Sequence, residues 1–221
     1  MNKYAFLSDF DGTISDDDFF YYTAEAFFDD SALAPWREYL TGNKTHFDAL
    51  KEMFASLRLS KEDFDRFVSG VRVDPKARSV FALCYEKGIP TYIASAGCDY
   101  YIKALIGEWI KTYNILLLAN NGEYDQTNGL TLKAPDINDP FYDRQTGVSK
   151  YKLAKTLKDQ GYTLIFAGDG LPDFESAKIA DVVFARKMLL EKCREARINT
   201  LEFNDFGDIE YFFINNIKEI R

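Results

Sequence analysis

The stretch YAFLSDFDGT, residues 4–13, decides the fold. Its first five residues are apolar or small, and Asp9 and Asp11 then flank Phe10 before Gly12. A short apolar run without alternation predicts a strand buried on both faces, as in a parallel sheet. Along an extended chain, Asp9 and Asp11 would point to the same side. Because open parallel sheets bind ligands at the carboxyl ends of their strands, we expect both aspartates to face a site there.

Four further apolar runs end in the same way, in small or acidic residues. Between them lie stretches whose apolar residues are spaced three or four apart, which predicts helices. This alternation predicts an α/β fold, a doubly wound, Rossmann-like parallel sheet with right-handed crossovers. The further predicted strands are Ile89–Ala94, Ile115–Leu118, Thr163–Ala167 and Val182–Ala185.

Residues 16–73 interrupt the alternation with four helical patterns and almost no strand signal. We therefore expect residues 1–15 and 74–221 to form the α/β core and residues 16–73 to form an inserted helical cap. Residues 122–133 (GEYDQTNGLTLK) contain an Asn-Gly pair and predict a β-hairpin. Residues 135–147, rich in Asp, Asn and Pro, predict a loop. The helical patterns are Asp18–Phe28, Ala32–Leu40, Phe47–Leu57 and Lys61–Val71.

The composition of the 221-residue chain excludes several classes of protein. Its 27 Lys and Arg against 35 Asp and Glu give a net charge of −8, which argues against a nucleic-acid or anionic-membrane partner. No apolar run approaches the roughly 20 residues of a membrane helix. The three cysteines have no C-x-x-C spacing and His46 is the single histidine, so a zinc site of the usual kind is excluded. We expect a cytoplasmic protein, and nothing in the sequence sets its oligomeric state.

Four small polar motifs follow the predicted strands. Each motif alone is common in turns or on surfaces. Together, in this order and each near a strand end, they predict one site. The motifs are DFDGT (residues 9–13), Ser95-Ala96-Gly97, Lys150, and GDGLPD (residues 168–173) with Asp169 and Asp173.

These motifs resemble those of the haloacid dehalogenase superfamily of phosphatases, in their order and over nearly the whole chain. Helices inserted directly after the first motif resemble the type 1 cap of that superfamily, which phosphoserine phosphatases share. Within the superfamily, SAGCDYYI (residues 95–102) and FARKMLLEKCRE (residues 184–195) are similar to the methionine-salvage 2-hydroxy-3-keto-5-methylthiopentenyl-1-phosphate phosphatases.

The resemblance implies a hydrolase with a carboxylate nucleophile. Asp9 would form an aspartyl-phosphate, and Asp11 would protonate the leaving group and later deprotonate water. The implied cofactor is Mg²⁺, held by the side chains of Asp9 and Asp169 and the backbone carbonyl of Asp11, with Asp173 in support. Apart from the resemblance, neighbouring carboxylates without a cation would repel one another and raise their own pKa values.

The resemblance also implies a set of phosphate-binding groups. Lys150 would neutralise the phosphoryl oxygens. The Ser95 hydroxyl would donate hydrogen bonds to them, as would the backbone amides near it, at Ala96 and Gly97, and that of Gly12.

Selection of the substrate would come from the cap. Asp18 matches an acidic cap residue near the substrate in phosphoserine phosphatases, and it equally suits the N-terminus of the first cap helix. Phe19 belongs to an aromatic group more typical of a cap core than of a substrate wall. Lys51 falls where phosphoserine phosphatases carry an arginine for the substrate carboxylate, and it lacks the bidentate fork. We interpret His46 as a surface or capping residue and Trp36 as packing.

These features predict a Mg²⁺-dependent phosphatase acting on a small-metabolite phosphomonoester, of the sugar-like kind found in methionine salvage. The alternative of a phosphoserine phosphatase is disfavoured by Lys51 and by Pro172, where those enzymes have asparagine. A second alternative is a non-catalytic protein that binds a phosphate ligand on the same fold, which the presence of all four motifs disfavours. The expected partner is a small phosphorylated metabolite, with no nucleic acid and no membrane.

Overall fold

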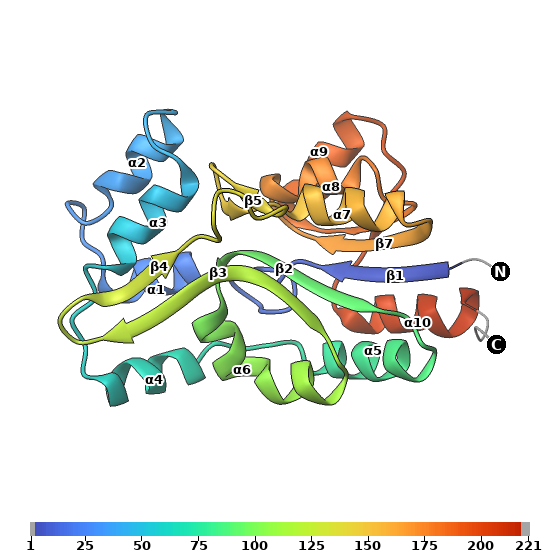
Figure 1. Ribbon diagram of the computed structural model, residues 1–221, viewed down its shortest axis with the longest axis horizontal. Coiled ribbons are helices and arrows are strands. Elements are labelled where there is room, and N and C mark those ends of the chain that lie inside the picture. The colour runs from blue at the N-terminus through green and yellow to red at the C-terminus, as the bar shows by residue number, and fades with distance from the viewer. Residues whose placement is uncertain (1–2, 218–221) are drawn as a thin grey trace.

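A seven-stranded sheet runs through the computed structural model, which describes residues 3–217 (Figure 1). The strand order is β4-β3-β2-β1-β7-β8-β9, and every neighbouring pair is parallel except β3 and β4. The predicted doubly wound α/β fold is therefore confirmed. The strands are β1 (Lys3–Ser8), β2 (Thr91–Cys98), β3 (Leu116–Asp125), β4 (Gly129–Lys133), β7 (Tyr162–Gly168), β8 (Val182–Ala185) and β9 (Leu201–Glu202).

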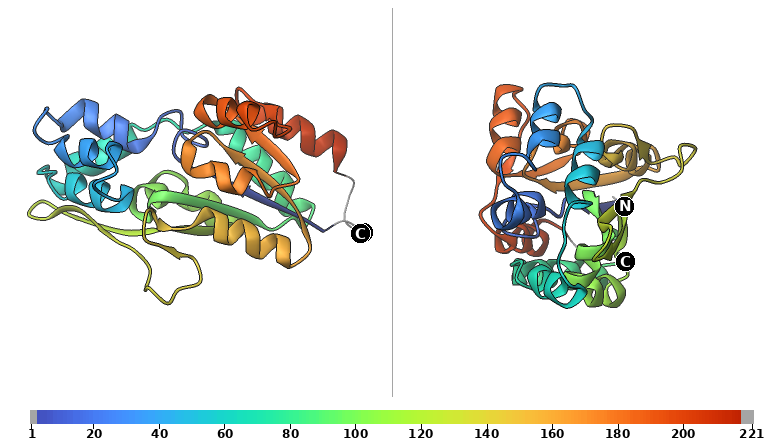
Figure 2. Two further views of the ribbon diagram at one scale, coloured as in Figure 1. Left: turned by 90° about the horizontal axis from the view of Figure 1, so that it is seen from above. Right: turned by 90° about the vertical axis from the view of Figure 1, so that its left-hand side faces the viewer.

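Helices cover both faces of this sheet (Figures 1 and 2). Alternate residues of β1 explain the unbroken apolar run, because Phe6 packs into the cluster beneath the sheet while Ala5 and Leu7 pack into the cluster above it. The lower layer is α5 (Pro75–Glu86), α6 (Asp99–Thr112) and α10 (Phe206–Asn216), and the upper layer is α7 (Lys150–Asp159), α8 (Phe174–Ala177) and α9 (Lys187–Glu195).

The predicted block of helices between β1 and α5 is present, and we call residues 16–73 the helical insertion. Three of its helices begin at side-chain N-caps, where the capping oxygen accepts a backbone N–H. The two segments that connect the insertion to the sheet pair with each other through a bridge between Ser15 and Val73. Its helices are α1 (Phe19–Phe27), α2 (Ala34–Leu40), α3 (His46–Phe54) and α4 (Lys61–Ser69).

The predicted hairpin is present, but it is not separate from the strand before it. The first part of β3 pairs in parallel with β2, and its last five residues pair antiparallel with β4. The hairpin extends beyond the sheet and packs against the insertion, where the Tyr124 hydroxyl donates to the carbonyl of Leu59 at 2.8 Å. Gly129 at the turn has φ +69°, and a side chain there would meet the backbone of Phe54.

The region predicted as a loop, residues 135–147, contains a short element that the sequence did not indicate. β5 (Tyr142–Asp143) pairs antiparallel with β6 (Gly147–Val148), and this small ribbon leads directly into α7. The loop also contacts the insertion, because the amide of Phe47 donates to the carbonyl of Gln145 at 2.8 Å. Across residues 3–217, the helices are all too short or too polar to span a membrane.

Candidate active site

Asp9 and Asp11 follow β1 at its carboxyl end, between the ends of β2 and β7. The intervening Phe10 is fully buried in the core, so the two aspartates face the opposite way. Gly12 then turns the chain with φ +71°, and a Cβ there would collide with the carboxylate of Asp169. Glycine is thus required at this position both by the backbone conformation and by the close approach of the two loops.

Lys150 connects two of the predicted motifs. Its ammonium group lies 2.6 Å from Asp9 Oδ1 and 2.6 Å from Asp173 Oδ1, and all three side chains are buried. Ser149 caps the N-terminus of α7 and so fixes Lys150 as the first helical residue. Opposite charges at this distance hold the pKa of Lys150 above its usual value, against the effect of burial.

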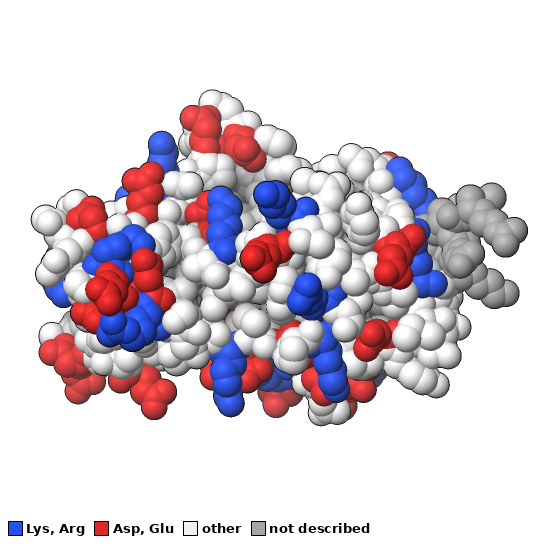
Figure 3. All heavy atoms as spheres, turned by 90° about the horizontal axis from the view of Figure 1, so that it is seen from below, with Lys and Arg blue, Asp and Glu red and all other residues white. Residues whose placement is uncertain are grey.

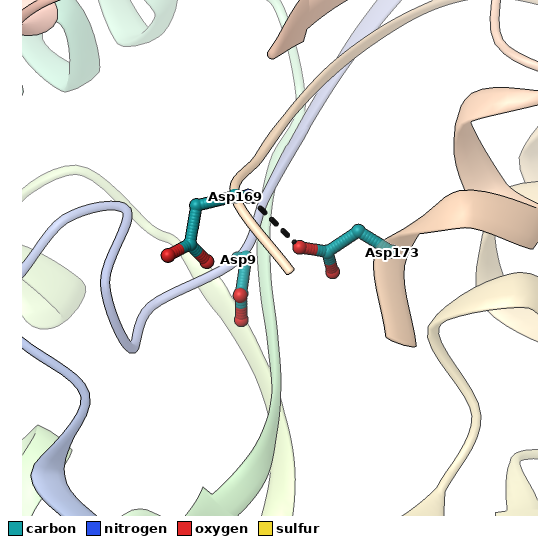
Figure 4. A group of neighbouring side chains, drawn as sticks. All are labelled: Asp9, Asp169 and Asp173. Carbon is teal, nitrogen blue, oxygen red and sulfur yellow. Dashed lines mark hydrogen bonds between the residues drawn. The ribbon is translucent and has the colours of Figure 1, made fainter. Parts of the chain in front are cut away.

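Three carboxylates gather beside Lys150, those of Asp9, Asp169 and Asp173 (Figure 4). One oxygen of each lies within 4.8 Å of the others. Burial raises the pKa of Asp9 well above its usual value, and repulsion from Asp173 adds to this effect. The group offers hard oxygen donors and more negative charge than Lys150 balances. This donor set fits Mg²⁺.

The three carboxylates are not equally free to bind a cation. Asp173 Oδ2 accepts the backbone N–H groups of Asp169 and Gly170 at 3.0 Å each, while its Oδ1 accepts from Lys150. Both of its oxygens are therefore engaged by the protein. Asp173 orients the loop that carries Asp169.

Asp11 lies where the core meets the insertion. Its Oδ2 accepts hydrogen bonds from Ser95 Oγ at 2.7 Å and from the Tyr101 hydroxyl at 2.8 Å, and its Oδ1 accepts from the amide of Phe19 at 3.3 Å. Burial raises the pKa of Asp11, and these hydrogen bonds partly oppose the rise. Tyr101 was not among the site residues predicted from the sequence, although it lies in the SAGCDYYI stretch.

Asn120 on β3 fixes the end of β2, around Ser95, by hydrogen bonds. The Asn120 side-chain amide donates to the carbonyls of Ala96, Gly97 and Thr146 at 2.9–3.1 Å. This one amide therefore joins the second motif to the loop before Lys150. The role of Asn120 could not be predicted from the sequence, because a single asparagine in a strand carries no local signal.

The predicted role of the Gly12 amide does not fit the structure. That amide donates to Ser15 Oγ at 3.2 Å, and Gly12 is not among the residues that line the cavity described next. Its carbonyl instead accepts from the side chains of Arg186 and Lys187, two residues of the FARKMLLEKCRE stretch. Lys187 Nζ also lies 3.2 Å from Asp169 Oδ2.

The motif residues converge on a cavity of about 70 Å³, which we call the inner cavity. The core supplies the other charged groups and the end of β2, and the insertion supplies Asp18 and most of the apolar wall. The lining residues are Asp9, Asp11, Asp18, Phe20, His46, Leu50, Phe54, Ala96, Gly97, Tyr101, Lys150, Asp169, Gly170 and Pro172.

The three insertion residues expected to select the substrate have different positions. Asp18 caps α1, accepting the amide of Phe20 at 2.7 Å, and it also lines the cavity. A position at the helix N-terminus and one near the substrate are therefore compatible. Burial, followed by the charge of Asp11, raises the pKa of Asp18 to about 7.

Phe19 faces the core and stacks on Tyr101 at 4.0 Å, while Phe20 lines the cavity. Lys51 was wrongly predicted, because it is exposed on α3, beside the face that Leu50 presents to the cavity.

A second cavity of about 530 Å³, the outer cavity, adjoins the inner one. The interpretation of His46 and Trp36 is incomplete, because His46 lines both cavities and Trp36 lines the outer one. Burial, together with the positive charge of Lys150, lowers the pKa of His46 to about 4. The outer lining is Asp17, Asp18, Tyr21, Tyr22, Glu25, Trp36, Tyr39, Leu40, His46, Asp169, Gly170, Leu171, Pro172, Lys187 and Met188.

The chain thus combines a largely parallel α/β sheet, a helical insertion after β1, and carboxylates and a lysine buried at the strand ends. A family model described as haloacid dehalogenase-like hydrolase matches residues 6–178, and the chain belongs to this family. The resemblance stated from the motifs is thereby confirmed.

Two relatives that are named as phosphatases resemble nearly the whole chain. A 2-hydroxy-3-keto-5-methylthiopentenyl-1-phosphate phosphatase of Bacillus velezensis is 30% identical, over 97% of this chain and 91% of the relative. A polyol phosphate phosphatase of Saccharomyces cerevisiae is 25% identical, over 95% and 92%. These relatives confirm the prediction of a phosphomonoester hydrolase.

Solved structures confirm the fold. A substrate-bound phosphoserine phosphatase superposes with a TM-score of 0.68, covering 96% of this chain and 99% of the other, at 18% identity. A family hydrolase from Salmonella enterica superposes with a TM-score of 0.70 over 99% and 73%, also at 18% identity.

Proposed function

We propose that this chain is a Mg²⁺-dependent phosphatase that hydrolyses the phosphomonoester of a small, sugar-like metabolite through an aspartyl-phosphate on Asp9. One observation carries the proposal: Asp9 and Asp11 line the same small cavity, with Lys150 bound to Asp9 and a hydroxyl pair bound to Asp11. This arrangement supports a nucleophile, a proton donor and a cation acting on one phosphoryl group.

In the first step, a carboxylate oxygen of Asp9 attacks phosphorus and the bond from phosphorus to the leaving oxygen breaks. The proton on Asp11 moves to that oxygen, so the leaving group departs as an alcohol. The raised pKa of Asp11 favours the protonated acid that this step needs. In the second step, Asp11 takes a proton from water, the water oxygen attacks phosphorus, and inorganic phosphate and free Asp9 result.

The cations and amides around Asp9 would stabilise the transferring phosphoryl group. Lys150 is positioned to neutralise its oxygens, and Ala96 and Gly97 line the cavity at the end of β2. Ser95 does not line it: its hydroxyl donates to Asp11 at 2.7 Å and accepts the Gly97 amide at 2.9 Å, so the Gly97 amide would bind a phosphoryl oxygen only after leaving Ser95. We assign the Mg²⁺ ligands to the side chains of Asp9 and Asp169 and the backbone carbonyl of Asp11, with Asp173 in support. Bound there, Mg²⁺ would reduce the repulsion between the anionic nucleophile and the phosphate dianion.

The residues that line the two cavities favour a substrate with an uncharged leaving group over phosphoserine, whose leaving group is the charged amino acid serine. Among the residues lining either cavity, the cationic ones are Lys150 and Lys187, and both are ion-paired with carboxylates. A carboxylate on the substrate would meet Asp17, Asp18 and Glu25 instead. Aromatic rings and hydrogen-bonding groups, by contrast, suit a polyol or ketose phosphate. We assign to the helical insertion, residues 16–73, the role of the cap that makes this selection.

Surface charge supports a small-molecule substrate. On the face drawn in Figure 3, basic side chains are interspersed with acidic ones. A nucleic acid would require a continuous basic surface. Cys84, Cys98 and Cys193 are buried free thiols, which supports the reducing, cytoplasmic setting expected for the enzyme.

The decisive experiment measures hydrolysis of p-nitrophenyl phosphate and of a panel of metabolite phosphates, in Mg²⁺ and in EDTA. Wild type is compared with Asp9→Asn, which keeps the shape of the side chain but removes the nucleophile. We expect Mg²⁺-dependent turnover that falls at least about 10³-fold in the variant. Full activity of Asp9→Asn would refute the nucleophile. Binding of phosphate and Mg²⁺ with no turnover of any compound would favour a non-catalytic binding protein.

A further inference from the structure

His46 lies between the two cavities. Five residues line both of them, and we call this shared lining the neck: Asp18, His46, Asp169, Gly170 and Pro172. The insertion supplies Asp18 and His46, and the loop after β7 supplies the other three. Any group that extends from the inner cavity into the outer one passes beside the imidazole of His46.

The imidazole is held in place but has an unsatisfied polar atom. Its ring packs edge-on against Trp36 and Tyr39, with centroid separations of 5.5 and 5.2 Å. Within residues 3–217, the buried Nδ1 of His46 has no hydrogen-bond partner. Nearly all buried polar atoms in proteins are paired, and leaving one unpaired costs free energy. Because the imidazole also lines both cavities, we take a bound ligand as the source of the partner that this ring lacks.

A structural role in helix α3 does not account for this histidine. Thr45 already provides the N-cap of α3, accepting the amide of Asp48 at 3.0 Å. Packing against Trp36 and Tyr39 needs only an apolar ring or branched side chain. At neutral pH the buried imidazole is uncharged, since its pKa is lowered to about 4. It therefore offers one N–H donor and one nitrogen acceptor.

The sizes of the cavities define which part of the substrate lies at the neck. The inner cavity, about 70 Å³ and lined by Asp9, Asp11 and Lys150, has room for little beyond the phosphoryl group. The outer cavity, about 530 Å³, is large enough for the rest of a small metabolite. Carbons close to the phosphoester oxygen would therefore lie beside Asp18 and His46.

We propose that His46 is a specificity residue whose imidazole hydrogen-bonds to a hydroxyl or carbonyl oxygen near the phosphoester, selecting polyol and ketose phosphates over alkyl phosphates. This inference rests on the proposed phosphatase function. The oxygen recognised belongs to one of the first carbons of the leaving group. Asp18 faces the same position and accepts a hydrogen bond from the same kind of hydroxyl.

The test compares kcat/KM on substrates matched in carbon number. Glycerol 1-phosphate is paired with propyl phosphate, and ribulose 5-phosphate with pentyl phosphate. In wild type we expect the oxygenated member of at least one pair to be preferred. His46→Leu should reduce that preference about 10-fold, because one buried hydrogen bond to the substrate is lost. His46→Asn, which keeps a polar atom near the position of Nδ1, should restore part of it.

Lys51→Gln, an exposed change on the same helix, is the matched control and should leave the preference unchanged. An equal fall on both members of a pair in His46→Leu would mean a purely structural role and would overturn the inference. So would a wild-type enzyme that prefers the alkyl phosphate in both pairs. If wild type hydrolyses no phosphomonoester, p-nitrophenyl phosphate included, the proposed function itself fails.

Discussion

The hydroxyl of Tyr101 lies 2.8 Å from Oδ2 of Asp11 and donates a hydrogen bond to it, although the two residues are 90 positions apart in the chain. The ring of Tyr101 also stacks on Phe19 at 4.0 Å. One side chain thus connects the proposed proton donor to the first helix of the insertion. Gly97 allows this contact, because a Cβ at that position would occupy the place of the Tyr101 hydroxyl.

Replacing Tyr101 with phenylalanine tests the importance of this hydrogen bond. Tyr101→Phe should keep the ring stack and the fold, but raise the pKa of Asp11 further, because the bond favours the charged form. We expect kcat to fall about 10-fold, because the second step needs Asp11 in the charged form that this hydrogen bond favours. Tyr100→Phe is the matched control, since Tyr100 donates to Asp65 on the insertion instead. Equal kcat in both variants would contradict the role of Tyr101.

Lys150 should be needed for activity, and its neighbour in sequence should not. Lys150→Met removes the charge between Asp9 and Asp173, and we expect kcat to fall at least about 100-fold. Lys152→Met serves as control, because Lys152 is exposed and donates to the carbonyl of Tyr142 at 2.6 Å. Steady-state rates measured in saturating Mg²⁺ decide the matter. A near-normal rate in Lys150→Met would remove it from the mechanism.

Mg²⁺ should stabilise the folded protein, because it relieves the repulsion among Asp9, Asp169 and Asp173. At 100 times its dissociation constant, a ligand of the native state adds about 2.7 kcal/mol to the free energy of unfolding. For a chain of this size, the midpoint of thermal unfolding should rise by roughly 5–10 °C relative to EDTA. Asp169→Asn should reduce the rise, while Asp159→Asn, an exposed site paired with Lys155, should not. Equal midpoints with and without Mg²⁺ would exclude the metal site.

Asp18 should make stability depend on pH. Its pKa rises from 3.8 to about 7 on folding, so the native state binds its proton more tightly than the unfolded state. The stability this provides is complete below about pH 4 and is lost as pH rises towards 7. Asp18→Asn keeps an N-cap but removes the titration. In EDTA, the unfolding free energy of wild type should fall relative to the variant by about 1 kcal/mol or more between pH 4 and 8. Parallel curves would contradict this.

The sequence alone predicted the sheet, the inserted helices and the four motifs because each has a local signal. Apolar runs mark strands buried on both faces, and apolar residues spaced three or four apart mark the inserted helices. Glycines and aspartates at strand ends mark loops that approach one another. The resemblance to a known family then supplied roles that spacing could not.

Other parts of the site depend on contacts between distant segments, which have no local signal. His46 looks like an ordinary residue at a helix start until the fold brings α3 and the loop after β7 to the same two cavities. Asn120 acquires its three carbonyl partners only when β2 and the loop before α7 meet beside the middle of β3. Lys51 was misplaced because its direction from α3 depends on which face of the helix packs inward. The Gly12 amide was misassigned because Ser15, three residues later, accepts its hydrogen bond.

The continuity of β3 from the sheet into the hairpin has a consequence for motion. The insertion is connected by two paired segments at Ser15 and Val73, and the hairpin holds it at a third place through Tyr124 and Leu59. Buried residues of the insertion and of the sheet belong to one apolar cluster. Little conformational entropy is then lost when the insertion orders over a substrate. Opening of the insertion would have to bend β3 or separate the hairpin from the insertion. We therefore expect release of phosphate to set the turnover rate and kcat to be sensitive to solvent viscosity.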